Sequence, residues 1–175
     1  ASFVLNHNTE MALQLPSWQE AVVLTEWVRK EGEWHCIPGK CMAPDAGVAA
    51  IYQAMVLGLR DYVNKAGFPG VLIGLSGGVD SALSAAVAVD ALGPDRVHCV
   101  MMPSPFTSKE SLEDASEAAT LLGIRYDTVS IEPAMAAFDD MLSPIFANRK
   151  ADVTEENIQA RSRGLLLMSI SNKFG

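Results

Sequence analysis

Short apolar segments alternate with helix-like segments after residue 70, and this alternation limits the possible folds more than any other feature of the sequence. The strand-like segments are VLIGL, VHCVMMP and YDTVSI; the helix-like segments cover residues 81–91 and 108–122, and two further helical stretches follow. Apolar strands joined by helices of this length are typical of a parallel sheet whose faces are covered by the crossover helices. The sequence therefore predicts an α/β fold with a parallel sheet.

The amino-terminal part of the chain has a different pattern. The β-like strings SFVLN, MALQLP, AVVLTEWV and EWHCI are separated by polar or glycine-bearing breaks. The segment PGKCMAPDAG, with two prolines and two glycines, is the best candidate linker. Apolar residues between positions 48 and 63 then recur at steps of three and four, which predicts a long amphipathic helix ending near Gly67. We therefore expect a short β-rich extension, residues 1–44, before an α/β region, residues 45–175.

Charge and cysteine content argue against several classes of partner. The chain has 13 basic and 21 acidic residues, a formal charge of -8 that opposes non-specific attraction to nucleic acids and anionic membranes. No apolar run approaches the roughly 20 residues that a bilayer span needs, and the amino terminus does not resemble a signal peptide. Three cysteines make no dense disulfide framework, which favours a reducing compartment. We expect a cytoplasmic protein with neither a nucleic-acid nor a membrane partner.

The segment SGGVDS lies at the joint between the strand VLIGL and the helix that follows it. Ligands of open α/β sheets collect at the carboxyl ends of strands, where the first turn of a helix exposes unpaired N–H groups. Gly77 and Gly78 have no β-carbon and let the backbone lie close to an anion, while Ser76 and Ser81 add hydroxyl donors. The joint therefore predicts a phosphate-binding loop; the alternative is a tight turn in which Asp80 caps the helix.

This joint differs from the two commonest phosphate-binding motifs. A Walker A sequence has Lys directly before its final Ser or Thr, where this chain has Asp80, and LIGLSGGVDS does not supply the dinucleotide fingerprint G-x-G-x-x-G. A carboxylate beside phosphates would repel them unless a divalent cation lay between. Asp80 is therefore interpreted as a ligand of nucleotide-bound Mg²⁺.

The motif SGGVDS, with its preceding strand, resembles the S-G-G-x-D-S loop of the adenine-nucleotide α-hydrolase-like ATP pyrophosphatases, which include GMP synthetase, asparagine synthetase and NAD synthetase. The segment TEENIQARSRGLLLMSISNKFG resembles the NAD synthetase helix, and MMPSPFTSKESLEDA, LGIRY and SIEPA resemble the part of glutamine-dependent NAD synthetases before it. The resemblance covers the whole chain. It implies a Rossmann-like fold, with residues 1–44 as the tail of a carbon–nitrogen hydrolase-like glutaminase domain plus linker, and residues 45–175 as the first part of the synthetase domain.

The activity implied by this resemblance is the ATP-dependent amidation of deamido-NAD to NAD through an adenylated carboxylate, a ligase reaction that releases AMP and pyrophosphate. Ammonia would come from glutamine, hydrolysed by the glutaminase domain of the full-length protein, and the resemblance also implies a homo-oligomer. The alternatives are another amidating or adenylating ATP pyrophosphatase and a non-catalytic nucleotide-binding fragment. Because the family has further ATP and metal contacts beyond the position of SNKFG, we expect a truncated chain that is weak or inactive alone.

The resemblance also implies roles for individual residues. Asn157 and Arg161 would bind deamido-NAD, Asp80 would bind Mg²⁺, and no side chain acts as a nucleophile. The spacing of four places Asn157 and Arg161 on one helix face; the alternative is a solvated surface where Arg161 pairs with Glu155 or Glu156. The residues expected to bind ATP are Gly74, Leu75, Ser76, Gly77, Gly78, Val79, Asp80 and Ser81.

Five side chains elsewhere carry structural expectations. Thr107 and Glu110 have the spacing of a capping box at the start of a helix. Arg163 is expected to be an ordinary surface residue. Met102 and Cys99, in the apolar strand VHCVMMP, are interpreted as core residues without a role in binding.

Overall fold

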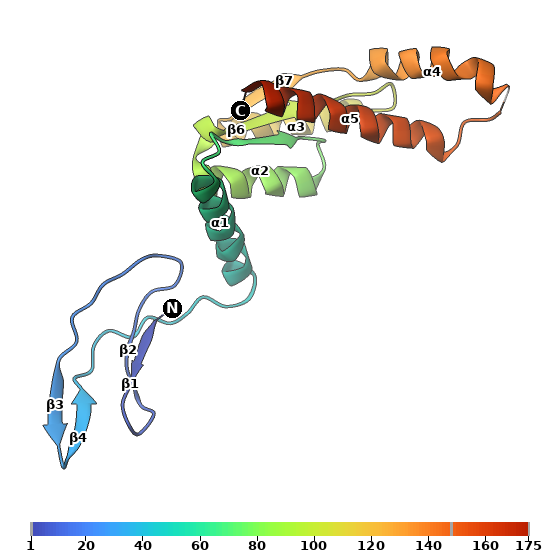
Figure 1. Cartoon of the computed structure of the whole chain (residues 1–175). Helices are drawn as coiled ribbons and strands as arrows, with labels where there is room; N and C mark the ends of the chain where they lie inside the picture. The colour runs from blue at the N-terminus through green and yellow to red at the C-terminus, as the bar shows by residue number, and fades with distance from the viewer. Residues whose placement is uncertain (1, 148, 175) are drawn as a thin grey trace. The chain divides into compact units, whose positions relative to one another are not determined.

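The computed structural model describes residues 2–147 and 149–174. These residues form two compact units that divide between Leu57 and Gly58. The division falls within helix α1 (Gly47–Ala66), the long amphipathic helix that the apolar spacing predicts. Each unit is described by itself below, and Figure 1 labels the elements of both.

The first unit contains two antiparallel strand pairs. Its strands are β1 (Phe3–Leu5), β2 (Met11–Gln14), β3 (Trp27–Lys30) and β4 (Glu33–Cys36), with β1 paired to β2 and β3 paired to β4 (Figure 1). The predicted strand AVVLTEWV is wrong over residues 21–26, which have no regular structure. The side chains of Val22 and Leu24 are fully exposed there, so the apolar run has no packed surface that could hold it in a sheet.

The second unit confirms the α/β prediction. Its elements in chain order are β5 (Val71–Gly74), α2 (Val79–Leu92), the 3₁₀ turn η1 (Pro94–Arg96), β6 (Val97–Met101), α3 (Lys109–Leu122), β7 (Arg125–Thr128), α4 (Glu132–Phe146) and α5 (Val153–Phe174). The three strands form a parallel sheet in the order β5-β6-β7. Parallel neighbours place the carboxyl ends of all three strands at one edge of the sheet, which is the edge where the loop after β5 begins.

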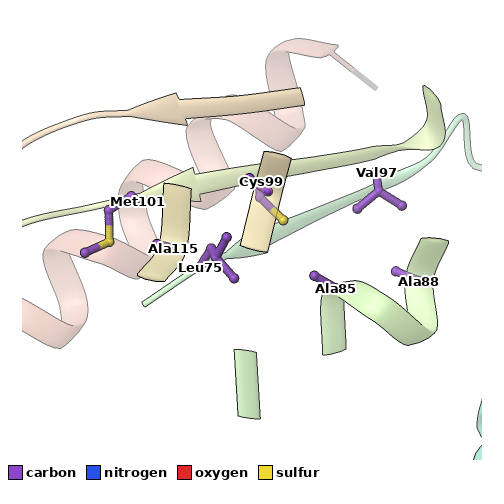
Figure 2. Close-up of a cluster of buried hydrophobic side chains, with 8 residues drawn as sticks. Leu75, Ala85, Ala88, Val97, Cys99, Met101 and Ala115 are labelled. Atoms are coloured by element: carbon purple, nitrogen blue, oxygen red, sulfur yellow. The ribbon is translucent and has the colours of Figure 1, made fainter. Parts of the chain in front are cut away.

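Side chains of β6 alternate between the two faces of the sheet and define two apolar clusters. Val97, Cys99 and Met101 pack with alanines of α2 and α3, and Figure 2 shows this cluster around Leu75. Val100 and Met102 belong to the other cluster, which includes apolar residues of α4 and α5. The sheet therefore lies between two helical layers. Burial raises the pKa of the Cys99 thiol to about 11, so this cysteine behaves as a small core residue, as expected.

The start of α3 differs from its predicted form. Ser108, not Thr107, is the N-cap residue, and its Oγ accepts a hydrogen bond of 3.1 Å from the backbone N–H of Ser111. The Thr107 Oγ1 instead accepts a bond of 2.9 Å from the N–H of Ser104, within the preceding turn. The predicted capping box of Thr107 and Glu110 is therefore wrong, because the Thr107 hydroxyl is already engaged one turn earlier.

The start of α5 has a reciprocal capping arrangement. The Asp152 Oδ1 accepts from the N–H of Thr154 at 2.8 Å, and the Glu155 Oε2 accepts from the N–H of Asp152 at 2.7 Å. The bond from Thr154 lowers the pKa of the Asp152 carboxyl. Glu155 therefore serves the helix end and not Arg161.

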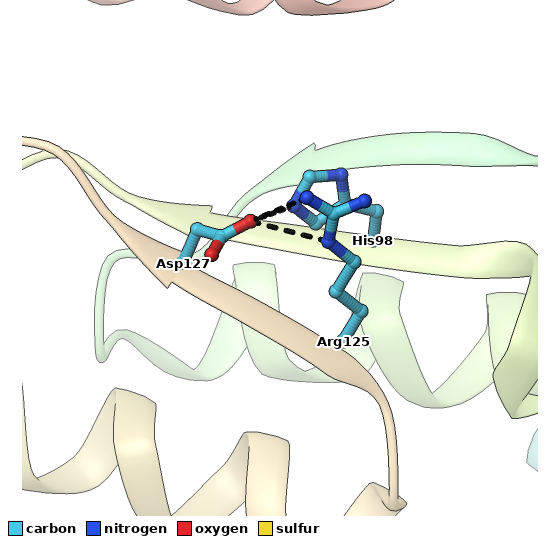
Figure 3. A network of polar contacts seen from close by, with 3 residues as sticks. All are labelled: His98, Arg125 and Asp127. Atoms are coloured by element: carbon cyan, nitrogen blue, oxygen red, sulfur yellow. Dashed lines mark hydrogen bonds and ion pairs between the residues drawn. The ribbon is translucent and has the colours of Figure 1, made fainter. Parts of the chain in front are cut away.

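A polar network links His98 on β6 to Arg125 and Asp127 on β7 (Figure 3). His98 Nε2 lies 2.7 Å from Asp127 Oδ2, and Arg125 donates to the same oxygen from Nε at 3.2 Å. The hydrogen bond with His98 is the main reason that the pKa of Asp127 is lowered, and the Arg125 charge contributes. In the part of the chain that the structure describes, no helix has both the length and the apolar character needed to cross a membrane.

Candidate functional site

The SGGVDS loop (residues 76–81) leaves the sheet directly after β5 and leads into α2. The backbone N–H of Leu75 donates to the Val100 carbonyl at 3.0 Å, which extends the pairing with β6 one residue past the strand. The Leu75 side chain is 1% exposed and anchors this end in the core. Ser76 is the first exposed residue of the segment, so the loop begins at the carboxyl edge of the sheet, as predicted.

Two serine hydroxyls shape the loop. The Ser81 Oγ donates to the Gly78 carbonyl at 2.9 Å and accepts from the N–H of Ser76 at 3.1 Å. The Ser76 Oγ lies 3.0 Å from the Ser81 Oγ and accepts from the N–H of Gly78 at 3.2 Å. The sequence suggested that these hydroxyls donate to a phosphate. In the structure they bond to the loop itself and fix the backbone that would surround a phosphate.

The two glycines of the loop meet different constraints. Gly77 has φ +81°, a conformation that favours glycine, and a β-carbon built on it would lie 2.7 Å from the Cα of Ser111 in α3. Gly78 has φ −86°, and its β-carbon would only approach the Ser76 Oγ at 3.4 Å. Of the two, only Gly77 is therefore required by the fold itself. Gly78 has no side chain that could cover the start of α2.

The first turn of α2 offers backbone donors and one carboxylate. Gly78 is its N-cap residue and supplies no side-chain cap. Asp80 lies inside this first turn, is exposed, and its carboxylate has no partner among the described residues. The alternative interpretation, in which Asp80 caps the helix, is therefore wrong. Uncapped N–H groups at a helix start are suited to an anion.

The chemistry of Asp80 fits a magnesium ion carried by a nucleotide. Within residues 2–147 and 149–174, no three His, Cys, Asp or Glu side chains are grouped to hold a metal by themselves. Mg²⁺ in proteins commonly uses one or two carboxylates and completes its coordination with phosphate oxygens and water. A single exposed carboxylate within a predicted phosphate loop suits that mode of binding.

A cavity of about 530 Å³ adjoins the loop. Gly74, Leu75 and Ser76 contribute one wall, and the remaining lining comes from β6, the turn before α3, and α5. Its further lining residues are Met101, Met102, Thr107, Ala160, Arg163, Gly164 and Leu167. The volume and mixed lining suit a small organic ligand such as a nucleoside.

Of the residues that line this cavity, the sequence interpretation gave a binding role only to Gly74, Leu75 and Ser76, and Arg163 and Met102 were expected to have none. Arg163 is half-buried, and its Nε donates to the Met102 carbonyl at 3.1 Å, so it links α5 to the end of β6. Met102 is buried, as expected, but also lines the cavity. The spacing of Ala160, Arg163 and Leu167 marks one face of a helix and is the signal that could have identified Arg163.

Asn157 and Arg161 are both exposed on α5. Neither lines the cavity, although Arg161 directly follows the lining residue Ala160. No ion pair joins Arg161 to Glu155 or Glu156 in the described structure, so the surface pairing given as the alternative does not occur. Both side chains are therefore accessible from solvent.

Comparison with known proteins identifies the family. The sequence profile of NAD synthase matches residues 51–175, which is most of the chain and includes the loop, the cavity and α5. The chain belongs to the NAD synthase family. This membership agrees with the parallel sheet and the loop described above.

Two curated members of the NAD synthase family match the chain over its full length. A glutamine-dependent NAD(+) synthetase from Rhodobacter capsulatus is 53% identical over 175 residues, and one from Acinetobacter baylyi is 47% identical over 175 residues. The match covers 100% of this chain but 32% of each relative. The chain therefore spans about a third of the length of these relatives.

Similar solved structures confirm the predicted fold. Glutamine-dependent NAD+ synthetase from Acinetobacter baumannii, in complex with ADP, superposes with a TM-score of 0.92 at 47% identity and covers 99% of this chain and 32% of that one. NMN synthetase from Francisella tularensis gives a TM-score of 0.67 at 31% identity, covering 74% and 52% of the two chains. The three-stranded parallel sheet is thus part of the ATP pyrophosphatase fold.

Proposed function

We propose that this NAD synthase family chain is part of a ligase that converts deamido-NAD to NAD, with cleavage of ATP to AMP and pyrophosphate. The observation that carries the proposal is the SGGVDS loop at an uncapped helix start, directly beside a cavity of about 530 Å³. An anion-binding loop next to a nucleoside-sized space suits a nucleotide. The names of the curated relatives support the choice of reaction.

The chemistry explains why such a loop is useful. A carboxylate is a poor electrophile, so it must first be joined to the α-phosphorus of ATP before ammonia can attack it. As the bond to the leaving pyrophosphate breaks, negative charge grows on its oxygens, and fixed backbone N–H groups stabilise that charge. Asp80 would hold a Mg²⁺ ion, which would supply additional positive charge at the phosphates. This mechanism needs no nucleophilic side chain.

The proposed roles of the residues follow from their positions. The loop from Ser76 to Ser81 binds the β- and γ-phosphates, and Gly74 and Leu75 lead into it from the sheet. The cavity takes the nucleoside part of ATP, with Arg163 holding α5 against the end of β6. Deamido-NAD is bound from the exposed face of α5 that carries Asn157 and Arg161; the accessibility of both side chains supports this assignment.

The proposal includes partners outside this chain. Ammonia is supplied by a glutaminase domain of the same full-length protein, with residues 1–44 as its tail and linker and residues 45–175 beginning the synthetase domain. The glutamine dependence named for relatives three times as long supports this arrangement. A homo-oligomer is supported by exposed apolar side chains such as Met141 and Ile145 on α4. Three free cysteines support a reducing, cytoplasmic location.

Isotope exchange between pyrophosphate and ATP tests the proposed reaction. In the full-length protein, deamido-NAD is expected to trigger the exchange because formation of the acyl adenylate is reversible. Xanthosine monophosphate and aspartate, the acceptors of other ATP pyrophosphatases, serve as controls and should not trigger it. Exchange that starts equally with any of the three, or with none, would contradict the proposed substrate.

A further inference from the structure

The first turn of α3 is in direct backbone contact with the SGGVDS loop. A β-carbon on Gly77 would lie 2.7 Å from the Cα of Ser111 and 2.9 Å from its carbonyl carbon. These are main-chain atoms, so no side-chain rotation could relieve the contact. The positive φ of Gly77 therefore occurs where the main chain of α3 limits the space on one side of the loop.

Ser108 holds this first turn of α3 in place. Its Oγ accepts from the N–H of Ser111 at 3.1 Å and lies 2.9 Å from the Ser111 Oγ. An N-cap hydroxyl satisfies a helix N–H that otherwise has no acceptor, and its loss frays the first turn. Because Ser111 is the residue that contacts Gly77, fraying of this turn removes the support behind the loop.

The same segment borders the cavity. The turn before α3 is closed by bonds between Ser104 and Thr107, from the Ser104 N–H to the Thr107 Oγ1 at 2.9 Å and from the Thr107 N–H to the Ser104 carbonyl at 3.0 Å. Thr107 lines the cavity and Ser108 follows it directly. The short segment from Thr107 to Ser111 thus joins the cavity wall to the residue that contacts Gly77.

We propose that Ser108 is a positioning residue for phosphate binding. It acts through Ser111: the cap keeps the first turn of α3 helical, and the backbone of that turn holds Gly77 in the conformation from which the loop receives the phosphates. This inference rests on the proposed role of the loop in binding ATP. It concerns affinity for the phosphates and not for the nucleoside, because the contact with Ser111 is made by the loop.

The test compares Ser108→Ala with Thr120→Ala. Thr120 lies in the last turn of the same helix, where its Oγ1 donates to the Ser116 carbonyl at 2.8 Å, so this control removes a hydroxyl away from the loop. Hydrogen–deuterium exchange is measured over residues 74–81 without ligand. Calorimetry then gives the affinities for MgATP and for adenosine.

In Ser108→Ala, we expect exchange of the loop amides to rise and MgATP affinity to fall, each by about three- to tenfold, the range expected for loss of a cap. Adenosine affinity should stay within about twofold, because Thr107, which lines the cavity, is held by its bonds with Ser104 and not by the Ser108 hydroxyl. Ser108→Thr, which keeps a capping hydroxyl, should restore both values, and Thr120→Ala should resemble the parent chain.

Two results would overturn the inference: loop exchange in Ser108→Ala equal to that of the parent, or a parallel loss of affinity for MgATP and adenosine. All variants are made in the full-length protein, and a full-length parent that binds no MgATP would contradict the proposed function. In that case hydrogen–deuterium exchange still shows whether Ser108 holds the loop. Failure of the proposed function is therefore distinguishable from failure of the inference about Ser108.

Discussion

Gly77 and Gly78 are the same residue type, but they have different structural roles. The sequence predicted that both let the backbone approach an anion. The structure separates them, because only Gly77 has a positive φ and a main-chain neighbour at its missing β-carbon. That difference depends on α3, which begins more than 30 residues later, and local sequence carries no information about it.

Substitution with alanine tests this difference. Gly77→Ala should lower the free energy of unfolding by about 1–3 kcal/mol, the typical range for a strained backbone position. Gly78→Ala is the matched control and should change it by less than about 1 kcal/mol. Urea unfolding of the two variants measures both values. Equal losses of stability in the two variants would contradict the distinct role of Gly77.

Asp127 provides a second prediction for a single residue. Its pKa is lowered, chiefly by His98, so its contribution to stability is present above the ordinary Asp pKa of about 3.9 and is lost as the pH falls through the lowered value. Because the side chain is half-exposed, Asp127→Asn should reduce the free energy of unfolding at pH 7 by less than about 1 kcal/mol. Urea unfolding at several pH values should show this difference shrink on acidification. A difference that grows in acid would be inconsistent with a lowered pKa.

Among the elements, α5 contributes most of the cavity-lining residues that sequence analysis did not predict. Its helical character and the shared face of Asn157 and Arg161 were predictable from spacing. Spacing could show that Arg163 shares a face with Ala160 and Leu167, but it could not show the hydrogen bond from Arg163 to the Met102 carbonyl, because that partner is 61 residues away in sequence. The parallel sheet and the alternation of strands and helices were predicted because periodicity and crossover length constrain them locally, whereas the strand order was not predicted.

The two arginines of α5 should therefore have separable effects. Arg163→Lys loses the bond from Nε to the Met102 carbonyl and should weaken MgATP binding by about tenfold, the cost of one hydrogen bond from a charged group. Arg161→Lys, the same exchange on the exposed face, should leave MgATP affinity within about twofold and act on deamido-NAD instead. Calorimetry with each ligand makes the comparison. Equal loss of MgATP affinity in both variants would contradict the assignment of Arg163 to the cavity.

At the scale of the whole molecule, the protein is acidic and yet is proposed to bind a polyanion. A net charge of -8 gives no general attraction for phosphates, so binding must come from local geometry at the carboxyl edge of the sheet. The sequence predicted this edge because strand and helix meet there at two glycines. It could not predict the division into units between Leu57 and Gly58, since that division falls within a continuous helix.

Calorimetry with ATP in the presence and absence of Mg²⁺ tests the central claim most directly. The claim is that the SGGVDS loop binds phosphates with Asp80 acting through a magnesium ion. Compared with the parent chain, Asp80→Asn should bind MgATP about tenfold more weakly or worse, because a charged oxygen ligand is lost. The same variant should bind metal-free ATP at least as well as the parent, because repulsion between carboxylate and phosphate is removed. Equal MgATP affinity for parent and variant, or a parent whose ATP affinity is unchanged by removal of Mg²⁺, would contradict the account.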